Sequence, residues 1–322
     1  MARFFITGAT GFVGSYIARE LLELGHSVKA LKRSNSQFNF VQDFVHRVEW
    51  CEGDVLDTMA LQQFFENVDY VVHAAAIVSF AKKDRKKMYE YNIQGTANML
   101  NVAKKFPIRK FIHISSVAAL GRSKKLKIIN EQTQWEDSDE NTEYAITKFH
   151  SEMEVWRASE EGLPVLVVNP SVVLGRGDKS RSSLQILSFA EQKLPFYPIG
   201  SLNYVDVRDV AHITVRLALS DIINERFILD GGTVSFREFF TKIAKLNQFS
   251  PPTIAIRPWM SEIAWRVFAV ASFLTGKESF FNKETARASM QNFIYDTSKI
   301  RSLGFRFRTL DETLEWIYKN EK

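Results

Sequence analysis

Short apolar runs alternate with longer amphipathic stretches along the first half of the chain. The runs are rich in Val, Ile and Leu, and several are continuous, which is typical of strands buried on both faces of a parallel sheet. Six strands are predicted, at Arg3–Thr7, Ser27–Lys32, Val48–Cys51, Tyr70–His73, Lys110–Ser115 and Pro164–Asn169. Helices are predicted between them at Val13–Leu24, Met59–Glu66, Lys86–Lys105 and Tyr144–Glu160. This alternation predicts an α/β fold of Rossmann type with a doubly wound parallel sheet.

After Asn169 the alternation gives way to stretches rich in Gly, Ser, Arg and Pro, with isolated helices between them. We therefore expect a smaller, discontinuous C-terminal part that binds the substrate. The expected division assigns residues 1–174, with returning segments near 203–230 and 287–300, to an NAD(P)-binding domain. The substrate-binding part is then residues 175–202, 231–286 and 301–322.

The most apolar segment of this second part is Trp259–Leu274. Its apolar residues at helical spacing, with the aromatic residues nearby, are Trp259, Ile263, Val267, Val270, Phe273, Phe280 and Phe281. Such a stripe is most simply core, and the alternatives are a wall of a hydrophobic pocket or a peripheral membrane contact. Because the segment contains Glu262 and Arg266 and falls short of the roughly 20 apolar residues of a membrane span, no integral span is expected.

The composition is that of an ordinary globular protein, with 45% hydrophobic and 25% charged residues among 322. The net charge of +5 comes from 42 basic and 37 acidic residues spread along the chain, which gives no support for a nucleic-acid partner. A single cysteine, Cys51, excludes an internal disulfide and leaves no cluster for a metal site. The apolar run Phe4–Ile6 is too short for a signal peptide, so we expect a cytoplasmic protein.

Three glycines, Gly8, Gly11 and Gly14, follow the first predicted strand and open the first helix. At this place in a βαβ series, glycines let the backbone approach a pyrophosphate, which the N–H groups of the helix N-terminus then bind. The predicted turn consists of Thr7, Gly8, Thr10, Gly11, Phe12, Val13 and Gly14.

The end of the second strand bears on the choice between NAD and NADP. Sites for NAD usually place an Asp or Glu there to bind the ribose, whereas this chain has Lys32, Arg33 and Ser34. Arg33, aided by Lys32, is expected to pair with the extra phosphate of NADP. The alternative is a solvated loop charge, with NAD as the cofactor.

Two further strand ends are expected to line the cofactor. Asp54 follows the third strand, where it can accept a hydrogen bond from the adenine amino group while Val55 packs on the ring. Asp54 could equally cap the next helix, a role for which Asp57 competes. The small residues that let the backbone pass the cofactor after the fourth strand are Ala74, Ala75 and Ala76.

Tyr144 and Lys148 are four residues apart on a predicted helix and therefore on one face of it. An ammonium near the phenol would lower the pKa of Tyr144 and make it a usable acid or base, and Lys148 could also hold the nicotinamide ribose. Ser115 and Ser116 end the fifth strand, at the carboxyl edge of the sheet where ligands of such folds bind.

A glycine turn, a Ser-Ser strand end and Tyr-x-x-x-Lys in this order resemble the extended class of the short-chain dehydrogenase/reductase superfamily. Further segments that match this class are Asn92–Thr96, Asn169–Gly175 and Tyr204–Ala211. The resemblance implies that Ser116, Tyr144 and Lys148 are catalytic, that Ser115 lies nearer the cofactor, and that Asn92 braces the central helix. It also implies a segment along the nicotinamide formed by Pro170, Ser171, Val172 and Val173.

The implied reaction is hydride transfer between the nicotinamide and a carbonyl carbon, with Tyr144 protonating the oxygen that Ser116 holds. Dehydratases of this class carry an acidic pair where this chain has Val117 and Ala118, and nucleotide-sugar epimerases usually have an arginine where it has Leu202. The better match is the dihydroflavonol-reductase-like and hydroxysteroid-dehydrogenase-like branch. This favours an NADP(H)-dependent oxidoreductase acting on a small, partly hydrophobic substrate.

Two alternatives stay open. Arg176, Arg181 and Arg257 could still reach a sugar diphosphate, as an NAD-dependent nucleotide-sugar epimerase would require. The chain could also be a sensor that binds a dinucleotide without turning it over, although an intact Ser116, Tyr144 and Lys148 argue against this. Homodimerisation through the helices that contain Asn92 and Tyr144 is expected from the family alone.

Overall fold

The computed structural model describes residues 1–79, 81–121, 128–178, 182–275 and 282–319. Its centre is a parallel sheet of seven strands in the order β11-β7-β5-β4-β1-β2-β3. These strands are β1 (Arg3–Thr7), β2 (Ser27–Lys32), β3 (Val48–Glu52), β4 (Tyr70–His73), β5 (Lys110–Ile114), β7 (Val165–Pro170) and β11 (Glu225–Leu229). The strand order reverses between β1 and β4, which is where doubly wound sheets bind ligands. The predicted Rossmann fold is confirmed.

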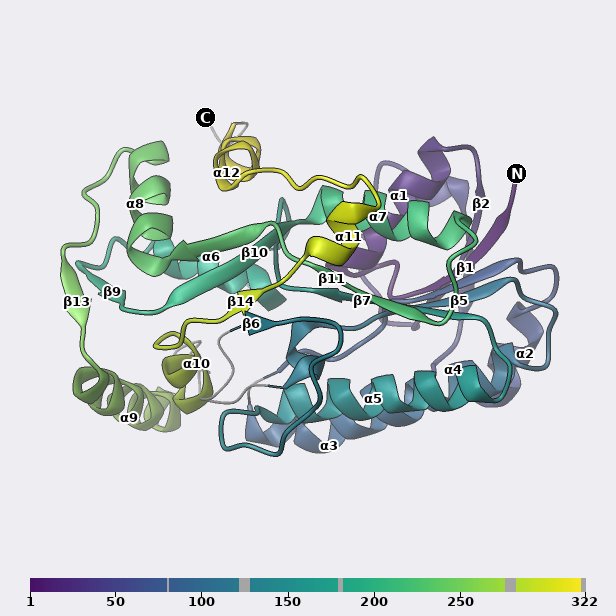
Figure 1. Ribbon diagram of the computed structural model, residues 1–322, viewed down its shortest axis with the longest axis horizontal. Helices are drawn as coiled ribbons and strands as arrows, with labels where there is room; N and C mark the ends of the chain where they lie inside the picture. Colours follow the sequence, from purple (N-terminus) through teal and green to yellow (C-terminus); the bar gives the residue numbers. More distant parts are fainter. Residues whose placement is uncertain (80, 122–127, 179–181, 276–281, 320–322) are drawn as a thin grey trace.

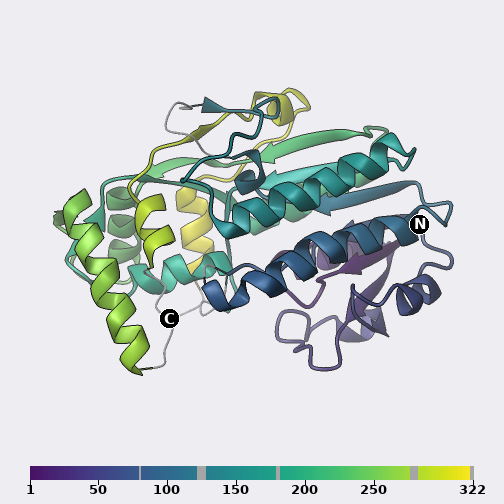
Figure 2. The same ribbon diagram turned by 90° about the horizontal axis from the view of Figure 1, so that it is seen from below.

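Helices cover both faces of this sheet (Figure 1). One face carries α1 (Phe12–Glu23) and α7 (Val207–Leu219), which pack against each other. The other face carries α2 (Thr58–Phe64), α4 (Gly95–Ala103) and α5 (Glu143–Glu160), and α4 and α5 run side by side in Figure 2.

The five inner strands, β7, β5, β4, β1 and β2, supply side chains to two separate cores, one on each face of the sheet. In β1, Ile6 faces the core beneath α1 and α7, while Phe5 faces the core beneath α4 and α5. In β5, Ile112 and Phe111 divide in the same way. Because successive side chains point to opposite faces, a strand buried on both must be apolar without interruption.

The predicted helix Lys86–Lys105 is divided by a π-helical turn. The structure has α3 (Arg85–Met88), the π-helical turn Tyr89–Gln94 and then α4. Asn92 is buried in this turn, where its side-chain amide hydrogen-bonds the backbone N and O of Ile77 at 2.7 and 2.9 Å and the Thr147 hydroxyl at 3.1 Å. Asn92 is therefore the expected brace, and its contacts account for the local widening of the helix.

The smaller part is built on a three-stranded sheet of order β12-β10-β8. Its elements include β8 (Val172–Leu174), α6 (Gln185–Ala190), β9 (Phe196–Pro198), β10 (Ser201–Asp206), β12 (Gly232–Ser235), α8 (Phe236–Leu246) and β13 (Ile254–Ile256). Helix α8 buries Phe236, Phe239, Phe240 and Ile243, a stripe at helical spacing that packs against this sheet. Since β10 leads directly into α7, the chain passes from the small sheet to the large one here.

The apolar segment forms α9 (Pro258–Thr275), at the outer end of the smaller part beside α10 (Lys283–Ala288) (Figures 1 and 2). Trp259, Ile263 and Val267 are 62%, 55% and 61% exposed, so the prediction that these side chains belong to the core is wrong. The side chains of Val270 and Phe273, and the whole of Phe280 and Phe281, lie outside the described residues. Among the helices that the structure describes, none has the length and apolarity to cross a bilayer.

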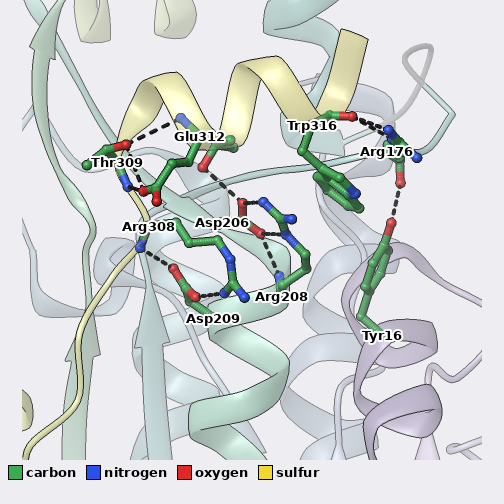
Figure 3. A network of polar contacts seen from close by, with 10 residues as sticks. Tyr16, Arg176, Asp206, Arg208, Asp209, Arg308, Thr309, Glu312 and Trp316 are labelled. Carbon is green, nitrogen blue, oxygen red and sulfur yellow. Dashed lines mark hydrogen bonds and ion pairs between the residues drawn. The ribbon is translucent and has the colours of Figure 1, made fainter. Parts of the chain in front are cut away.

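Near the C-terminus, β14 (Ile294–Tyr295) pairs with β6 (Ile128–Ile129) in a separate two-stranded sheet. The chain then returns to the large sheet, where α11 (Ser298–Ser302) lies against β11. The last helix, α12 (Leu310–Tyr318), is held by the network in Figure 3. The Arg176 guanidinium donates to the Trp316 carbonyl, and the Tyr16 hydroxyl donates to the Arg176 carbonyl at 3.1 Å. The Arg208 guanidinium lies 3.8 Å from the centre of the Trp316 ring. These contacts join α12 to α1 and α7.

Candidate functional site

The glycine turn is packed tightly against the end of β4. Gly8 has φ of +76°, and a Cβ on it would lie 2.7 Å from the backbone of Ala74 and Ala75. A Cβ on Gly14 would lie 2.2 Å from the Gly8 carbonyl oxygen, and Gly11 N donates to that oxygen at 2.9 Å. Neither Gly8 nor Gly14 has room for a Cβ. Glycine at these two positions therefore lets the loop after β1 pack directly on the first turn of α1.

The N-terminus of α1 opens at this turn. Gly11 is its N-cap, and this cap supplies no side-chain hydrogen bond, nor does the first helical turn contain an acidic residue. The N–H groups of Phe12, Val13 and Gly14 therefore lack helical partners, and together with the helix dipole they suit an anion. The Thr7 side chain faces inward, toward His73, so at this position the turn offers backbone groups to a ligand.

The Thr7 hydroxyl belongs to a buried polar contact beneath the turn. It lies 2.7 Å from His73 Nδ1 and accepts from Ala75 N at 3.2 Å. Burial lowers the pKa of His73 to about 3, so this imidazole is neutral. Its other nitrogen lies 3.0 Å from the Thr96 hydroxyl. Thr7 and His73 thus fix the ends of β1 and β4 to each other and to α4.

Asp54 does not cap α2, and its Oδ1 accepts from Leu56 N at 2.9 Å. Asp57 accepts from the first-turn N–H groups of α2, at 3.1 Å in each case. Asp54 instead accepts from the Tyr91 hydroxyl at 3.0 Å, across the end of β3. Val55 is buried against Gly95 of α4, so its side chain faces the core.

The two cations at the end of β2 differ in their surroundings. Lys32 forms an ion pair with Glu52 on the neighbouring strand. Arg33 is exposed and lies beside Tyr91. Burial and Asp54 raise the pKa of the Tyr91 phenol, and the Arg33 charge opposes this rise. Arg33, Asp54 and Tyr91 therefore form one polar cluster at the ends of β2 and β3. Tyr91 was not predicted from the sequence, because its direction depends on the π-helical turn.

The catalytic candidates meet at the end of β5. Thr142 caps α5 by accepting from Ala145 N at 3.1 Å, which places Tyr144 in the first turn of this helix. Tyr144 hydrogen-bonds Ser116, the residue that ends the loop after β5. Lys148 is 2% exposed, and its Nζ donates to the Ile114 carbonyl at 2.9 Å. The structure thus brings Ser116, Tyr144 and Lys148 together.

The electrostatics of this group differ from the expectation in one respect. Burial raises the pKa of Tyr144 to about 12, and the hydrogen bond with Ser116 opposes this rise. The pKa of Tyr144 is thus raised and not lowered as expected, and the Lys148 amine donates to the Ile114 carbonyl. Burial also lowers the pKa of Lys148 to about 8, against the charge of Glu152, which raises it. At neutral pH the phenol is therefore protonated and the amine is mostly charged.

The segment Pro170–Val173 runs along the end of β7 into the small sheet. Ser171 N donates to the Leu229 carbonyl at 3.0 Å, and Val172 and Val173 pair with β10. Asp230 follows β11 and is 3% exposed beside Ser171. Burial raises the pKa of Asp230 to about 7, while Ser171 and Arg301 lower it. Asp230 was not predicted from the sequence, since an isolated aspartate after a strand is typical of an exposed turn.

The structure also places the residues that would distinguish a dehydratase or an epimerase from a reductase. Val117 and Leu202 are buried, at 6% and 5% exposure, and supply neither an acid nor a cation. The Arg176 guanidinium is turned to Trp316 of α12, and Arg257 is exposed between β13 and α9. Arg181 lies outside the described residues. Within the described ranges, no three His, Cys, Asp or Glu residues are grouped so as to hold a metal ion.

Comparisons with known proteins show the family of the chain. The model of the NAD dependent epimerase/dehydratase family matches residues 4–227. A Synechocystis sp. protein provisionally named dihydroflavonol 4-reductase is 30% identical over 321 residues, covering 97% of this chain and 92% of its own. Cinnamoyl-CoA reductase 2 of Arabidopsis thaliana is 30% identical over 96% of this chain and 89% of its own. The crystal structure of gox2253 superposes with a TM-score of 0.82 at 27% identity, covering 99% and 98% of the two chains.

Fold, site and relatives together define an NAD(P)-dependent oxidoreductase of the extended short-chain dehydrogenase/reductase class. The chain belongs to the NAD dependent epimerase/dehydratase family, within its dihydroflavonol-reductase-like branch.

Proposed function

We propose that this protein is an NADP(H)-dependent reductase that converts a carbonyl group of a small, partly hydrophobic substrate into an alcohol, or performs the reverse oxidation. The observation that carries the proposal is the hydrogen-bonded pair of Ser116 and Tyr144, one helical turn from the Lys148 ammonium. This group lies at the carboxyl edge of β5, two strands along the sheet from the glycine turn after β1. A dinucleotide bound at that turn can extend across the strand switch point to the hydroxyl pair.

The proposed roles follow from the protonation states. Bound NADPH would supply the hydride for the substrate carbon. Ser116 would hold the substrate oxygen by a hydrogen bond, and Tyr144 would donate its proton to that oxygen. Because the pKa of Tyr144 is raised to about 12, the phenol is available as an acid throughout the neutral range. Lys148, whose amine donates to the Ile114 carbonyl, would hold the nicotinamide ribose and keep a positive charge at this end of the site.

The preference for NADP(H) rests on Arg33. Its guanidinium is exposed at the end of β2, while Lys32 is engaged with Glu52. A guanidinium binds phosphate oxygens in a bidentate manner, and the described end of β2 offers no acid for a ribose diol. Arg33 is thus the proposed contact for the additional phosphate, with Asp54 and Tyr91 beside it at the adenine end.

Two names among the relatives support a carbonyl substrate, since one relative is named dihydroflavonol 4-reductase and the other cinnamoyl-CoA reductase. An epimerase is less well supported, because the residue at the sugar-diphosphate position, Leu202, is buried and Arg176 is turned toward α12. The smaller part, residues 175–202, 231–286 and 301–322, is the proposed source of substrate contacts.

The test is an NADPH-oxidation assay with aldehydes, ketones and acyl-CoA thioesters, including aromatic members, followed by the absorbance of the reduced nicotinamide. Tyr144→Phe should lower kcat by about a hundredfold or more, since it removes the acid, while NADPH binding stays within about twofold. Tyr70→Phe is the matched control, because Tyr70 is the first residue of β4 and therefore lies at the amino end of the strands, away from the carboxyl edge that carries the site.

Three results would contradict the proposal. Oxidation of NADPH that survives in Tyr144→Phe would remove this residue from the reaction. Tight NADPH binding with no oxidation by any member of the panel would favour a sensor. Interconversion of a nucleotide sugar without net loss of reduced nicotinamide would show an epimerase.

A further inference from the structure

Glu152 is a buried acid on the same face of α5 as the catalytic pair. It follows Tyr144 by two helical turns and Lys148 by one, so the three side chains form a single row. The side chain is only 1% exposed. An ionisable residue so deeply buried is strongly unfavourable unless it has charged or hydrogen-bonding partners, so its contacts indicate what it does.

Three strands of the large sheet supply those contacts. Glu152 Oε2 accepts from the Ser115 hydroxyl at 2.7 Å and from Asn169 Nδ2 at 2.9 Å. Its other oxygen, Oε1, lies 3.0 Å from the Arg226 guanidinium. Asn169 Nδ2 also donates to the Ser116 carbonyl at 3.0 Å. The carboxylate therefore fixes the ends of β5 and β7, together with the loop that carries the substrate-side serine.

The same carboxylate acts on Lys148. Burial lowers the pKa of the Lys148 amine to about 8, and the charge of Glu152 is the contribution that raises it. The other ionisable groups that face this amine are His73 on β4 and His113 on β5. Burial holds the pKa of both imidazoles far below neutrality, so neither competes as a cation.

Arg226 on β11 lies on the far side of Glu152, where its guanidinium is also 5.4 Å from the centre of the Trp156 ring. Glu152 is thus paired with Arg226, lies one helical turn from Lys148, and supplies the negative charge that raises the pKa of the lysine amine.

We propose that Glu152 is a positioning residue that acts as the internal counter-charge of the Lys148 ammonium and fixes Ser115 and Asn169 around the reacting end of the site. The inference rests on the proposed reductase function only for its kinetic consequence. In the proposed reaction a charged Lys148 is required at the reacting end of the site, so Glu152 sets the pH above which turnover falls.

The direct experiment is a pH titration of the Lys148 side-chain nitrogen by NMR in the full chain labelled with ¹⁵N-lysine. Lys148→Arg identifies the resonance. In Glu152→Gln, which is nearly isosteric with the native residue, the pKa of Lys148 should fall by about one unit. Glu160→Gln, the same change at an exposed position of the same helix, should leave it in place. An unchanged pKa in Glu152→Gln, or an equal fall in Glu160→Gln, would overturn the proposal.

Glu152→Asp keeps the negative charge but moves it away from Lys148 by one methylene. This variant is the test if Glu152→Gln does not fold. Its Lys148 pKa should lie between those of the wild type and of Glu152→Gln, and a value at or above the wild type would contradict the assignment.

The kinetic readout is the pH profile of kcat/KM for carbonyl reduction. In Glu152→Gln the alkaline limb of this profile should shift to lower pH by about one unit, as the Lys148 pKa does. A purely structural role would lower the whole profile without moving its limb. The NMR titration needs no substrate, so failure to find a reducible carbonyl would count against the proposed function alone. An unchanged Lys148 pKa in Glu152→Gln would count against the role of Glu152 alone.

Discussion

Asp230 should make the stability of this protein fall as the pH rises from about 4 to about 7. Its carboxyl is 3% exposed at the end of β11, and burial raises its pKa from 3.8 to about 7. Between these two values the folded chain retains a proton that the unfolded chain releases. The free energy of unfolding therefore decreases with pH in this window. A difference of about three units corresponds to about 4 kcal/mol once the pH exceeds both values.

Asp230→Asn removes this titration and keeps a neutral amide beside Ser171. The variant should gain about 2–3 kcal/mol relative to the wild type between roughly pH 5 and pH 8, the part of the cost that develops over this interval. Urea unfolding followed by tryptophan fluorescence at several pH values measures the difference. Asp139→Asn, an exposed aspartate, should show no such dependence. A stability difference between Asp230→Asn and the wild type that does not change with pH would refute the reasoning.

Two further substitutions test the dinucleotide end of the site. Arg33→Gln should raise the KM for NADPH by about tenfold or more and leave that for NADH nearly unchanged, because charge-assisted hydrogen bonds to the phosphate are lost. Lys32→Gln, which breaks an existing pair with Glu52, should change the NADPH value much less, and the reverse order would exclude Arg33 as the phosphate contact. Gly14→Ala should weaken dinucleotide binding by at least about tenfold in equilibrium titration, because the new Cβ would meet the Gly8 carbonyl at 2.2 Å. Unaltered binding would show that the turn can relax.

The large sheet was predictable because its strands are buried on both faces. The strands predicted from Arg3 to Asn169 are observed with ends shifted by at most one residue. Their apolar runs carry the signal directly, and it does not depend on distant partners. The central helix was less predictable, since its π-helical turn depends on the bonds of Asn92 to Ile77 and Thr147, which no local pattern contains.

The site was predictable where chemistry requires a fixed order along the chain, as for the glycine turn, Ser116 and Tyr144. Glu152 was missed because a glutamate within a polar helix is typical of an exposed residue, and its burial depends on Arg226, which is 74 positions away in the sequence. The exposed face of α9 shows the opposite difficulty. Helical spacing of Trp259 and Ile263 predicts an apolar face correctly, but not whether another element of the same chain covers it.

The network that holds α12 bears on the order in which the protein folds during synthesis. Trp316 contacts Arg176 across 140 positions, and Arg176 contacts Tyr16 across 160. Contacts between such distant residues are slow to form and depend on segments that must fold first. A nascent chain could thus complete its large sheet while the ribosome still holds the final helix. Until Trp316 emerges and packs against Arg176 and Arg208, α12 is not secured to α1 and α7. Premature arrest of translation should consequently produce a species with an ordered sheet and an unsecured smaller part, a natural substrate for chaperones.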